Sequence, residues 1–246
     1  MRGFLFFAAL CSLIPFSAQG VEKEAAFPDE KVERLDSVVV STSRAGRNTP
    51  VTYTMVGREE LRRANPLNSL PMNLGLQPSV ISVNEGGTGL GYSKMTVRGS
   101  KGSQINVTLN GITLNDAESQ EVFWVNIPAL SSMISSVQLQ RGLGTSANGA
   151  GAFGASINMQ TGELVDKPYV TFNGSYGSFH TNKETLKLGS GLIDGHWAFD
   201  LRLSHIATDG YIDRASVDLN SYYLQGAYYA DHTSVKFISF AGQERT

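Results

Sequence analysis

"VQLQRGLGTSANGAGAFGASINMQTG", residues 137–162, decides between two folds. Three of its residues have the G-x-G-x-x-A spacing of a dinucleotide-binding turn: Gly142, Gly144 and Ala147. That spacing binds a nucleotide only where a strand enters the turn and a helix leaves it. Residues 136–140 before the turn alternate as a strand does, but so do residues 155–160 after it. Because no helix N-terminus is available to bind a phosphate, the stretch predicts a tight glycine connection between two strands and no nucleotide site.

The first 20 residues have the pattern of a secretory signal peptide. Arg2 precedes an apolar run that is too short to span a membrane as a helix, and a small-x-small cleavage site ends at Gly20. Cleavage removes Cys11, the only cysteine, and lowers Lys plus Arg from 20 to 19 against 22 Asp plus Glu, so the formal net charge moves from −2 to −3. The mature chain can form no disulfide, and its charge excludes a nucleic-acid-binding footprint. An exported, glycine-rich chain of this kind indicates a periplasmic or outer-membrane β protein.

Two short segments follow the signal peptide. Residues 21–34, "VEKEAAFPDEKVER", are charged, contain a proline and lack periodicity, so they are expected to form a mobile arm. Residues 35–43 are extended and β-branched, and their backbone suits pairing with the edge of a partner's sheet. An ordinary internal strand is the alternative for this second segment.

Residues 44–162 combine short helices, strands and loops. Helical turns are expected at 56–66 and at 68–77, the second with Pro71 in its first turn. Strand segments follow, and one of them is a hairpin that turns at Asn110-Gly111; the segments are 79–83, 95–100, 105–115 and 136–140. The region therefore predicts a small mixed α/β domain that is rich in loops.

Residues 166–246 alternate between apolar and polar positions in five segments: 169–179, 184–190, 196–205, 221–229 and 233–241. Past the first connection, the links between these segments are short, long and short, as in outer-membrane barrels. A soluble β-sandwich would give a similar alternation, and it remains the alternative for this region.

The third of these segments assigns two faces. One face is apolar and is expected to contact lipid: Trp197, Phe199, Leu201 and Leu203. Asp200 and Arg202 lie on the other face, which is expected to line the lumen of a barrel. Aromatic residues close to the expected strand ends suit the girdles of such a barrel: Trp197, Tyr211, Tyr222, Tyr228 and Tyr229.

Several motifs together resemble the N-terminal part of the TonB-dependent outer-membrane receptors. "DSVVVSTSR" is similar to a TonB box, "MTVRGS" to a strand of the plug domain, and "VTLNGITLND" to another plug element. "SVQLQRGLGTSANGAGAFGASINMQT" is similar to the family's V-E-V-x-R-G-P-x-S-x-x-Y-G motif and the residues that follow it. The chain departs from that motif at Leu143, Asn148 and Ala155, which affects packing rather than chemistry. The resemblance covers residues 35–246.

This resemblance implies a mixed α/β plug domain inside a transmembrane antiparallel β-barrel. About 22 barrel strands of about 10 residues each would need well over 200 residues, whereas only 81 residues remain from Asp166 onward. The chain is therefore expected to be a fragment that holds only about the first five barrel strands. The implied domains are a signal peptide, an arm, a TonB box, the plug and a truncated barrel: 1–20, 21–34, 35–43, 44–162 and 166–246.

The implied function is TonB-dependent, energy-coupled import of a scarce nutrient across the bacterial outer membrane, with the N-terminus in the periplasm. The nutrient is expected to be siderophore-bound iron, haem, cobalamin or a glycan, and the other partners are outer-membrane lipid and TonB, the inner-membrane energy transducer. TonB is expected to add a strand to the box through Asp36, Ser37, Val38, Val39, Val40, Ser41 and Thr42. No cofactor, nucleotide or nucleic acid is expected. A passive porin or adhesin barrel, which needs neither box nor plug, is the alternative.

Substrate contacts are expected at loops of the plug that point outward: Tyr92, Asn115, Asp116, Gln120 and Phe123. These residues place polar groups beside aromatic rings, a mix that suits ligand recognition. The alternative is that they only cap the plug against barrel loops. No metal site is expected among the four histidines, because their spacings match no zinc site: His180, His196, His205 and His232. No catalytic motif is found, so the chain is not expected to be an enzyme.

Overall fold

The computed structural model describes residues 44–245 except for 47–48, 65–66, 144–150 and 231. All of the described residues belong to one compact unit of the chain, residues 39–246. The predicted signal peptide, arm and TonB box all lie outside the described residues. No helix among the residues that the structure describes is long and apolar enough to cross a membrane.

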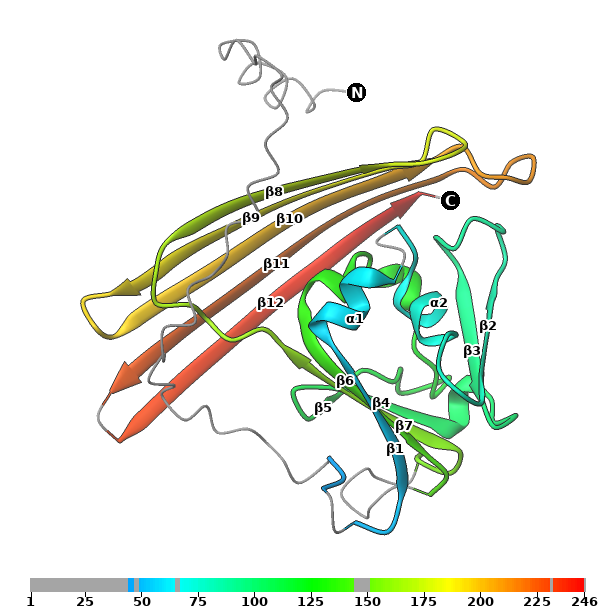
Figure 1. Ribbon diagram of the computed structural model, residues 1–246, viewed down its shortest axis with the longest axis horizontal. Helices are drawn as coiled ribbons and strands as arrows, with labels where there is room; N and C mark the ends of the chain where they lie inside the picture. The colour runs from blue at the N-terminus through cyan, green and yellow to red at the C-terminus, as the bar shows by residue number, and fades with distance from the viewer. Residues whose placement is uncertain (1–43, 47–48, 65–66, 144–150, 231, 246) are drawn as a thin grey trace. The chain divides into compact units, whose positions relative to one another are not determined.

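The first part of the unit is built on a five-stranded sheet, called the plug sheet below. Its spatial order is β1-β6-β7-β4-β5, so strands that are far apart in sequence lie side by side (Figure 1). β4 and β7 pair in parallel, and the other neighbours are antiparallel. The strands are β1 (Thr52–Gly57), β4 (Ile105–Leu109), β5 (Ile112–Thr113), β6 (Ile134–Arg141) and β7 (Ala155–Thr161).

The sequence failed to predict strand β1. It is an edge strand that pairs with β6 over six residues, from Thr52 opposite Arg141 to Gly57 opposite Ser136. Only Val56 of this strand is buried, so its alternation of apolar and polar residues is weak. We attribute the strand to pairing with β6, because the tertiary partner overrides a weak local pattern.

The hairpin expected at Asn110-Gly111 is confirmed. Leu109 pairs with Ile112, and the two residues between them have φ values of +51° and +84°. A two-residue turn with both central φ values positive matches the right-handed twist of the flanking strands. Asparagine and glycine adopt this conformation at the lowest cost.

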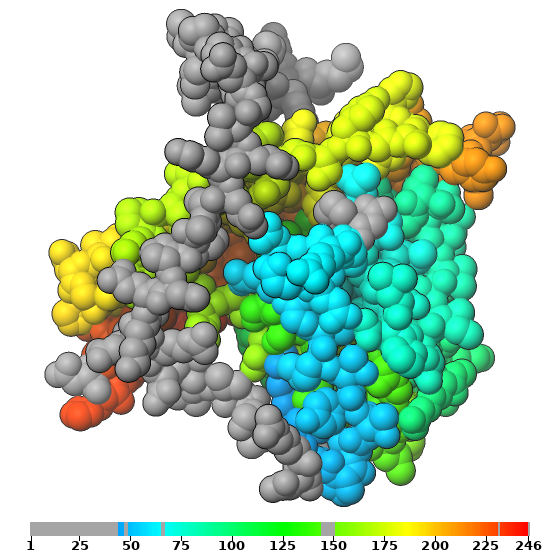
Figure 2. All heavy atoms as spheres, in the orientation of Figure 1, coloured from blue at the N-terminus to red at the C-terminus, as the bar shows by residue number. Residues whose placement is uncertain are grey.

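Short helices and turns surround the plug sheet: α1 (Arg58–Arg63), α2 (Leu70–Leu74), and the 3₁₀ turns η2 (Gly102–Gln104), η3 (Trp124–Asn126) and η4 (Leu130–Ser132). The second helix has a proline in its first turn, as expected, where the missing N–H removes no helical hydrogen bond. The cyan atoms of both helices and the teal atoms of the hairpin after them form one continuous surface (Figure 2).

A separate hairpin of β2 (Val80–Asn84) and β3 (Ser93–Val97) completes the plug. The hydrophobic core lies between this hairpin, the helices and the plug sheet. Strands β4 and β7 are buried along almost their whole length, and the side chains of Val137, Leu139 and Ile157 have no exposed area. Burial on both faces explains why these strands are apolar or uncharged throughout.

The second part of the unit is an antiparallel sheet of five strands in sequence order, called the wall below (Figure 1). It confirms the five strands predicted from residue 169 onward. The first strand is shorter than the periodicity indicated, and the other four are longer. They are β8 (Tyr169–Tyr176), β9 (Asn182–Ile193), β10 (Trp197–Thr208), β11 (Val217–Ala230) and β12 (Thr233–Arg245).

The two faces of the wall differ as the sequence of the third segment predicted. On one face, apolar side chains lie opposite one another across the strands, for example Leu188, Leu201 and Leu224. On the other face, Arg202 is only 4% exposed and packs toward the plug. Tyr222 was expected near a strand end, but β11 begins five residues earlier at Val217, so Tyr222 lies inside the strand opposite Leu203.

Candidate ligand-binding and partner-binding sites

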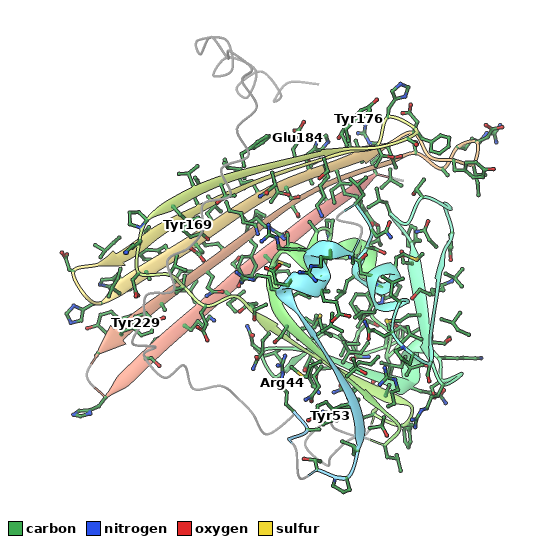
Figure 3. The ribbon with its side chains drawn as sticks, viewed as in Figure 1. Arg44, Tyr53, Tyr169, Tyr176, Glu184 and Tyr229 are labelled. Atoms are coloured by element: carbon green, nitrogen blue, oxygen red, sulfur yellow. The ribbon has the colours of Figure 1, made fainter. Side chains whose placement is uncertain are left out.

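The chain enters the described plug at Arg44 and Ala45, which are held against the plug sheet (Figure 3). The Arg44 guanidinium donates to Ser136 Oγ at 3.0 Å, to the Ser136 carbonyl at 3.2 Å and to the Asn158 carbonyl at 2.9 Å. The Gln138 side chain pairs with both backbone groups of Ala45, at 2.7 and 2.8 Å. Partial burial lowers the pKa of Arg44 from its usual range, but a guanidinium remains charged at physiological pH.

The predicted TonB-box residues, Asp36 to Thr42, lie outside the described residues. Arg44 and Ala45 follow this segment directly and were not predicted as site residues. Their partners are more than 90 residues away in sequence, so no local pattern could have revealed the contact.

The loop between β2 and β3, residues 85–92, is organised by the side chain of Asn84. Its Nδ2 donates to the carbonyl of Leu90 at 2.5 Å and to that of Tyr92 at 3.1 Å, and its Oδ1 accepts from the N–H of Gly89 at 3.0 Å. Three glycines in the loop have positive φ, which only glycine adopts without strain. The predicted ligand residue Tyr92 is 43% exposed at the end of this loop, and its hydroxyl donates to Glu244 of the wall at 3.4 Å.

The other predicted ligand residues lie in the segment 115–123, and two of them are used to build it. The Asn115 amide accepts from the N–H of Val107 at 2.8 Å and donates to the carbonyls of Ile105 and Gln120 at 2.9 and 2.8 Å. One carboxylate oxygen of Asp116 accepts from the N–H of Ser119 at 2.8 Å and from its hydroxyl at 3.0 Å. These hydrogen bonds lower the pKa of Asp116, because they stabilise the charged form.

Gln120 and Phe123 are both exposed, but the side chain of Gln120 is hydrogen-bonded within the segment. Gln120 has a φ of +59°, and its side chain donates to the carbonyl of Ala117 at 2.9 Å. Phe123 is 48% exposed directly before η3. Tyr92 and Phe123 are the two aromatic residues of the predicted set, and the rings of both are accessible to a ligand.

A groove of about 290 Å³ lies close to both loops. It runs between β3 and the segment 121–124, and its lining includes Ser93, the neighbour of Tyr92, and Val122, the neighbour of Phe123. Its remaining lining residues are Lys94, Met95, Thr96, Lys101, Gly102, Ile105, Val107, Glu121 and Trp124. Lys94 forms an exposed ion pair with Glu85 at 2.8 Å, and this partner raises the pKa of Lys94. The groove therefore offers apolar surface with charged groups at its rim.

Sequence reasoning also missed Arg141, which is buried. The Nε atom of Arg141 donates to the carbonyl of Pro78 at 2.9 Å, and its Nη1 donates to Thr54 Oγ1 at 2.7 Å. These contacts join the end of β6 to β1 and to the segment before β2. The signal that could have found Arg141 is its place in the "QRG" part of the quoted family motif.

The plug is attached to the wall by side-chain donors of the wall. Arg202 donates to the carbonyl of Ala129 at 2.5 Å and to the hydroxyl of Ser132, and Lys187 donates to the carbonyl of Ser132 at 3.2 Å. Ser221 donates to the carbonyl of Pro128 at 3.3 Å. The acceptors lie in η4 and the residues before it. A second, apolar contact joins Leu90 and Val125 of the plug to Ile206, Val217 and Leu219 of the wall.

The glycine turn at 142–147 joins two strands, as the sequence predicted. Strand β6 ends at Arg141 and strand β7 begins at Ala155, and the two pair in an antiparallel arrangement. Gly142 has a φ of +97°, whereas Gly144 and Ala147 lie outside the described residues. Among the residues with assigned positions, no group of three or more His, Cys, Asp or Glu side chains gathers in a way that could hold a metal ion.

Comparison with known proteins agrees with this arrangement. The model of the TonB-dependent receptor plug domain matches residues 45–156. No match to the chain is found among the curated proteins.

Solved structures match over both the plug and the wall. The ferric yersiniabactin uptake receptor FyuA of Yersinia pestis is 18% identical, with a TM-score of 0.62 over 82% of this chain and 32% of its own. The ferripyoverdine receptor of Pseudomonas aeruginosa is 15% identical, with a TM-score of 0.67 over 83% of this chain and 27% of its own. The copper transporter OprC is 18% identical, with a TM-score of 0.64 over 82% of this chain and 32% of its own.

The chain spans about a third of the length of these solved receptors. At these identities the structural match establishes the fold, and the family model independently identifies the plug. Residues 45–156 therefore match the TonB-dependent receptor plug domain, and the plug and the strands after it share the fold of the solved receptors.

Proposed function

We propose that this protein imports a metal chelate across the bacterial outer membrane, using energy that TonB delivers to residues 36–42. The observation that carries the proposal is a plug domain that continues directly into an amphipathic antiparallel wall. A plug that is bonded to the wall must be moved before a solute can pass, so transport requires an energy source.

The contacts at Arg44 support residues 36–42 as the place where that energy enters. A pulling force applied there reaches the plug first at Arg44 and Ala45, which are bonded to the central strands β6 and β7. Val38 and Val40 supply one apolar face of an extended segment whose backbone can add to a sheet edge. The N-terminus is then periplasmic, where TonB can reach it.

A metal chelate is favoured as the substrate because the solved structures of similar fold include receptors for ferric yersiniabactin and ferripyoverdine, and a copper transporter. We place the chelate against the groove beside β3, where the exposed rings of Tyr92 and Phe123 are next in sequence to the lining residues Ser93 and Val122. Asn115, Asp116 and Gln120 shape the loop that leads to the lining residues Glu121 and Val122, and they complete the proposed set of substrate contacts.

The test of TonB coupling is Val39→Pro in the full-length protein. Proline removes a backbone donor and fixes φ, so it prevents strand addition at that position. We expect the variant to lose co-purification with the C-terminal domain of TonB. We also expect it to lose uptake of radiolabelled iron supplied as ferric yersiniabactin or ferripyoverdine, or of copper, whichever of these the unaltered protein transports.

Ala25→Pro is the matched control, because it places the same residue in the preceding arm. It should leave both TonB binding and uptake unchanged. Normal TonB binding by Val39→Pro would show that this segment is not the box, whereas uptake of none of the three probes by the unaltered protein would reject only the choice of substrate.

A further inference from the structure

Arg202 on β10 has one half of its guanidinium hydrogen-bonded, and the other half finds no acceptor among the described residues. Its Nη1 atom donates to Ala129 and Ser132 of the plug. Its Nε and Nη2 atoms are buried, and neither has a hydrogen-bond partner among the described residues. The residue as a whole is only 4% exposed. A buried charged donor without an acceptor is costly, so this half of the side chain requires an explanation.

The two unpaired nitrogens lie on the same edge of the guanidinium plane. That edge presents two parallel N–H groups, the geometry in which arginine binds a carboxylate or phosphate through two oxygens at once. The ring of Tyr223 lies 5.9 Å from the guanidinium carbon. A cation–π contact of this kind stabilises the charge, but it does not accept the two in-plane N–H groups.

The surroundings of Arg202 carry an excess of positive charge. Lys187 is its direct cross-strand partner, and like charges in directly opposite positions destabilise a sheet. Arg58 of α1 lies within electrostatic range of Lys187. The nearby acid on this face is Asp200, which is already hydrogen-bonded to Tyr169. Lys183 also lies within electrostatic range of Arg202 and Lys187, so one carboxylate faces at least four cations at the contact between plug and wall.

We propose that the free edge of Arg202, with Lys187 beside it, binds a small oxyanion, a carboxylate or a phosphate. The anion accepts both in-plane N–H groups of Arg202 and separates its charge from that of Lys187. Because Arg202 and Lys187 also hold residues 129 and 132 of the plug, the bound anion stabilises the plug against the wall. The site is distinct from the groove beside β3 and does not depend on which nutrient is transported.

The experiment uses the full-length protein in detergent, dialysed into chloride, with acetate and inorganic phosphate as probes. Calorimetric titration and the thermal unfolding midpoint are measured at constant ionic strength. We expect saturable binding of at least one probe and a midpoint that rises with its concentration. Arg202→Lys keeps the charge but lacks the two-donor edge, so its affinity should fall about tenfold or more.

Arg245→Gln is the control, because it removes a charge from an exposed position at the end of β12. It should bind the probe like the unaltered protein. Lys187→Met should weaken binding without abolishing it, which provides a second readout if the Arg202 variant is poorly folded.

Two results would overturn the proposal. One is equal affinity in Arg202→Lys and the unaltered protein, which would mean that the anion does not use the free edge. The other is no saturable binding of acetate or phosphate to the unaltered protein, which would mean that this edge is satisfied by water or by a carboxylate of the protein itself.

Discussion

Polar side chains in the plug fall into two groups, those that build its loops and those that remain available to a ligand. The side chain of Asn84 forms four hydrogen bonds and that of Asn115 forms three, all within their own region. The rings of Tyr92 and Phe123 remain about half exposed. From sequence, a loop-building asparagine and a ligand-binding asparagine look the same, because both lie beside glycines and aromatics. The sequence could therefore locate the loops but could not divide the roles within them.

This division predicts different outcomes at Phe123 and Asn115. Phe123→Ala removes an exposed ring between the groove residues Val122 and Trp124, where we propose that the chelate binds. It should therefore lower the affinity for the chelate with little change in stability. Asn115→Ala leaves the buried N–H of Val107 and the buried carbonyl of Ile105 without partners. It should therefore lower the free energy of unfolding by about 1–3 kcal/mol.

Equilibrium binding of the chelate and denaturant unfolding of the full-length protein separate the two effects. Gln120→Ala is a suitable control for stability, because its side chain is exposed and bonds only within the loop. If Phe123→Ala left the affinity unchanged and Asn115→Ala left stability unchanged, both the rim of the groove and the loop-building role would be wrongly assigned.

The buried arginines mark the limit of sequence reasoning at this scale. Arg202 was placed on the correct face of its strand by period-two alternation alone. Arg44 and Arg141 gave no such signal, because each is defined by partners 63 or more residues away. Charge in a strand or next to one indicates a polar environment, but it does not identify the acceptor.

At the scale of helices and strands, regularly alternating strands and turns with specific residues could be predicted from the sequence. The short edge strand β1 could not. The wall strands and the Asn110-Gly111 hairpin were found because each has a strong local signal. Strand β1 has five partly or fully exposed residues in six and exists because β6 offers it a partner. The parallel pairing of β4 with β7 could not be predicted either, since it joins segments about 50 residues apart.

The alternation of β10 also predicts which of its substitutions are tolerated. Leu201 lies between Leu188 and Leu224 on the face away from the plug, where we propose contact with lipid. Leu201→Arg should destabilise the folded receptor in a bilayer by about 2–4 kcal/mol if the residue lies near the midplane. Asp200→Asn should cost much less, because the residue lies on the polar face.

Urea unfolding in lipid vesicles measures both variants of β10. Cysteine substitution provides an independent check, since a lipid-soluble thiol reagent should label position 201 and not position 200. Labelling at 200 alone would reverse the assignment of the two faces.

For the whole molecule, the order of contacts along the chain suggests how the parts are connected. Residues 44–45 attach the entry of the chain to β6 and β7. Directly before β6, η4 and the residue that precedes it accept hydrogen bonds from side chains of the wall. The start of β6 therefore lies between the entry of the chain and the plug residues that are bonded to the wall. The sequence predicted the succession of parts, but these connections depend on side chains that meet only after folding.

This arrangement predicts that Arg44 restrains the segment that precedes it. Arg44→Ala removes three hydrogen bonds from a charged donor to the plug sheet, which should lower the stability of the plug by about 2 kcal/mol. Because residue 44 would no longer be bonded to the plug sheet, TonB should reach the segment 36–42 more easily when no chelate is bound. Binding of the C-terminal domain of TonB should then depend less on added chelate.

Arg62→Ala is the matched control, because Arg62 carries the same charge and forms an exposed ion pair with Glu59. Its binding of TonB should rise on addition of the chelate as in the unaltered protein, and its unfolding midpoint should not move. Spin labels or cysteine reagents placed at residue 39 report accessibility directly in the same samples. If Arg44→Ala changed neither the accessibility of residue 39 nor the chelate dependence of TonB binding, the contacts of Arg44 would serve only the stability of the plug, and energy would reach β6 by another route.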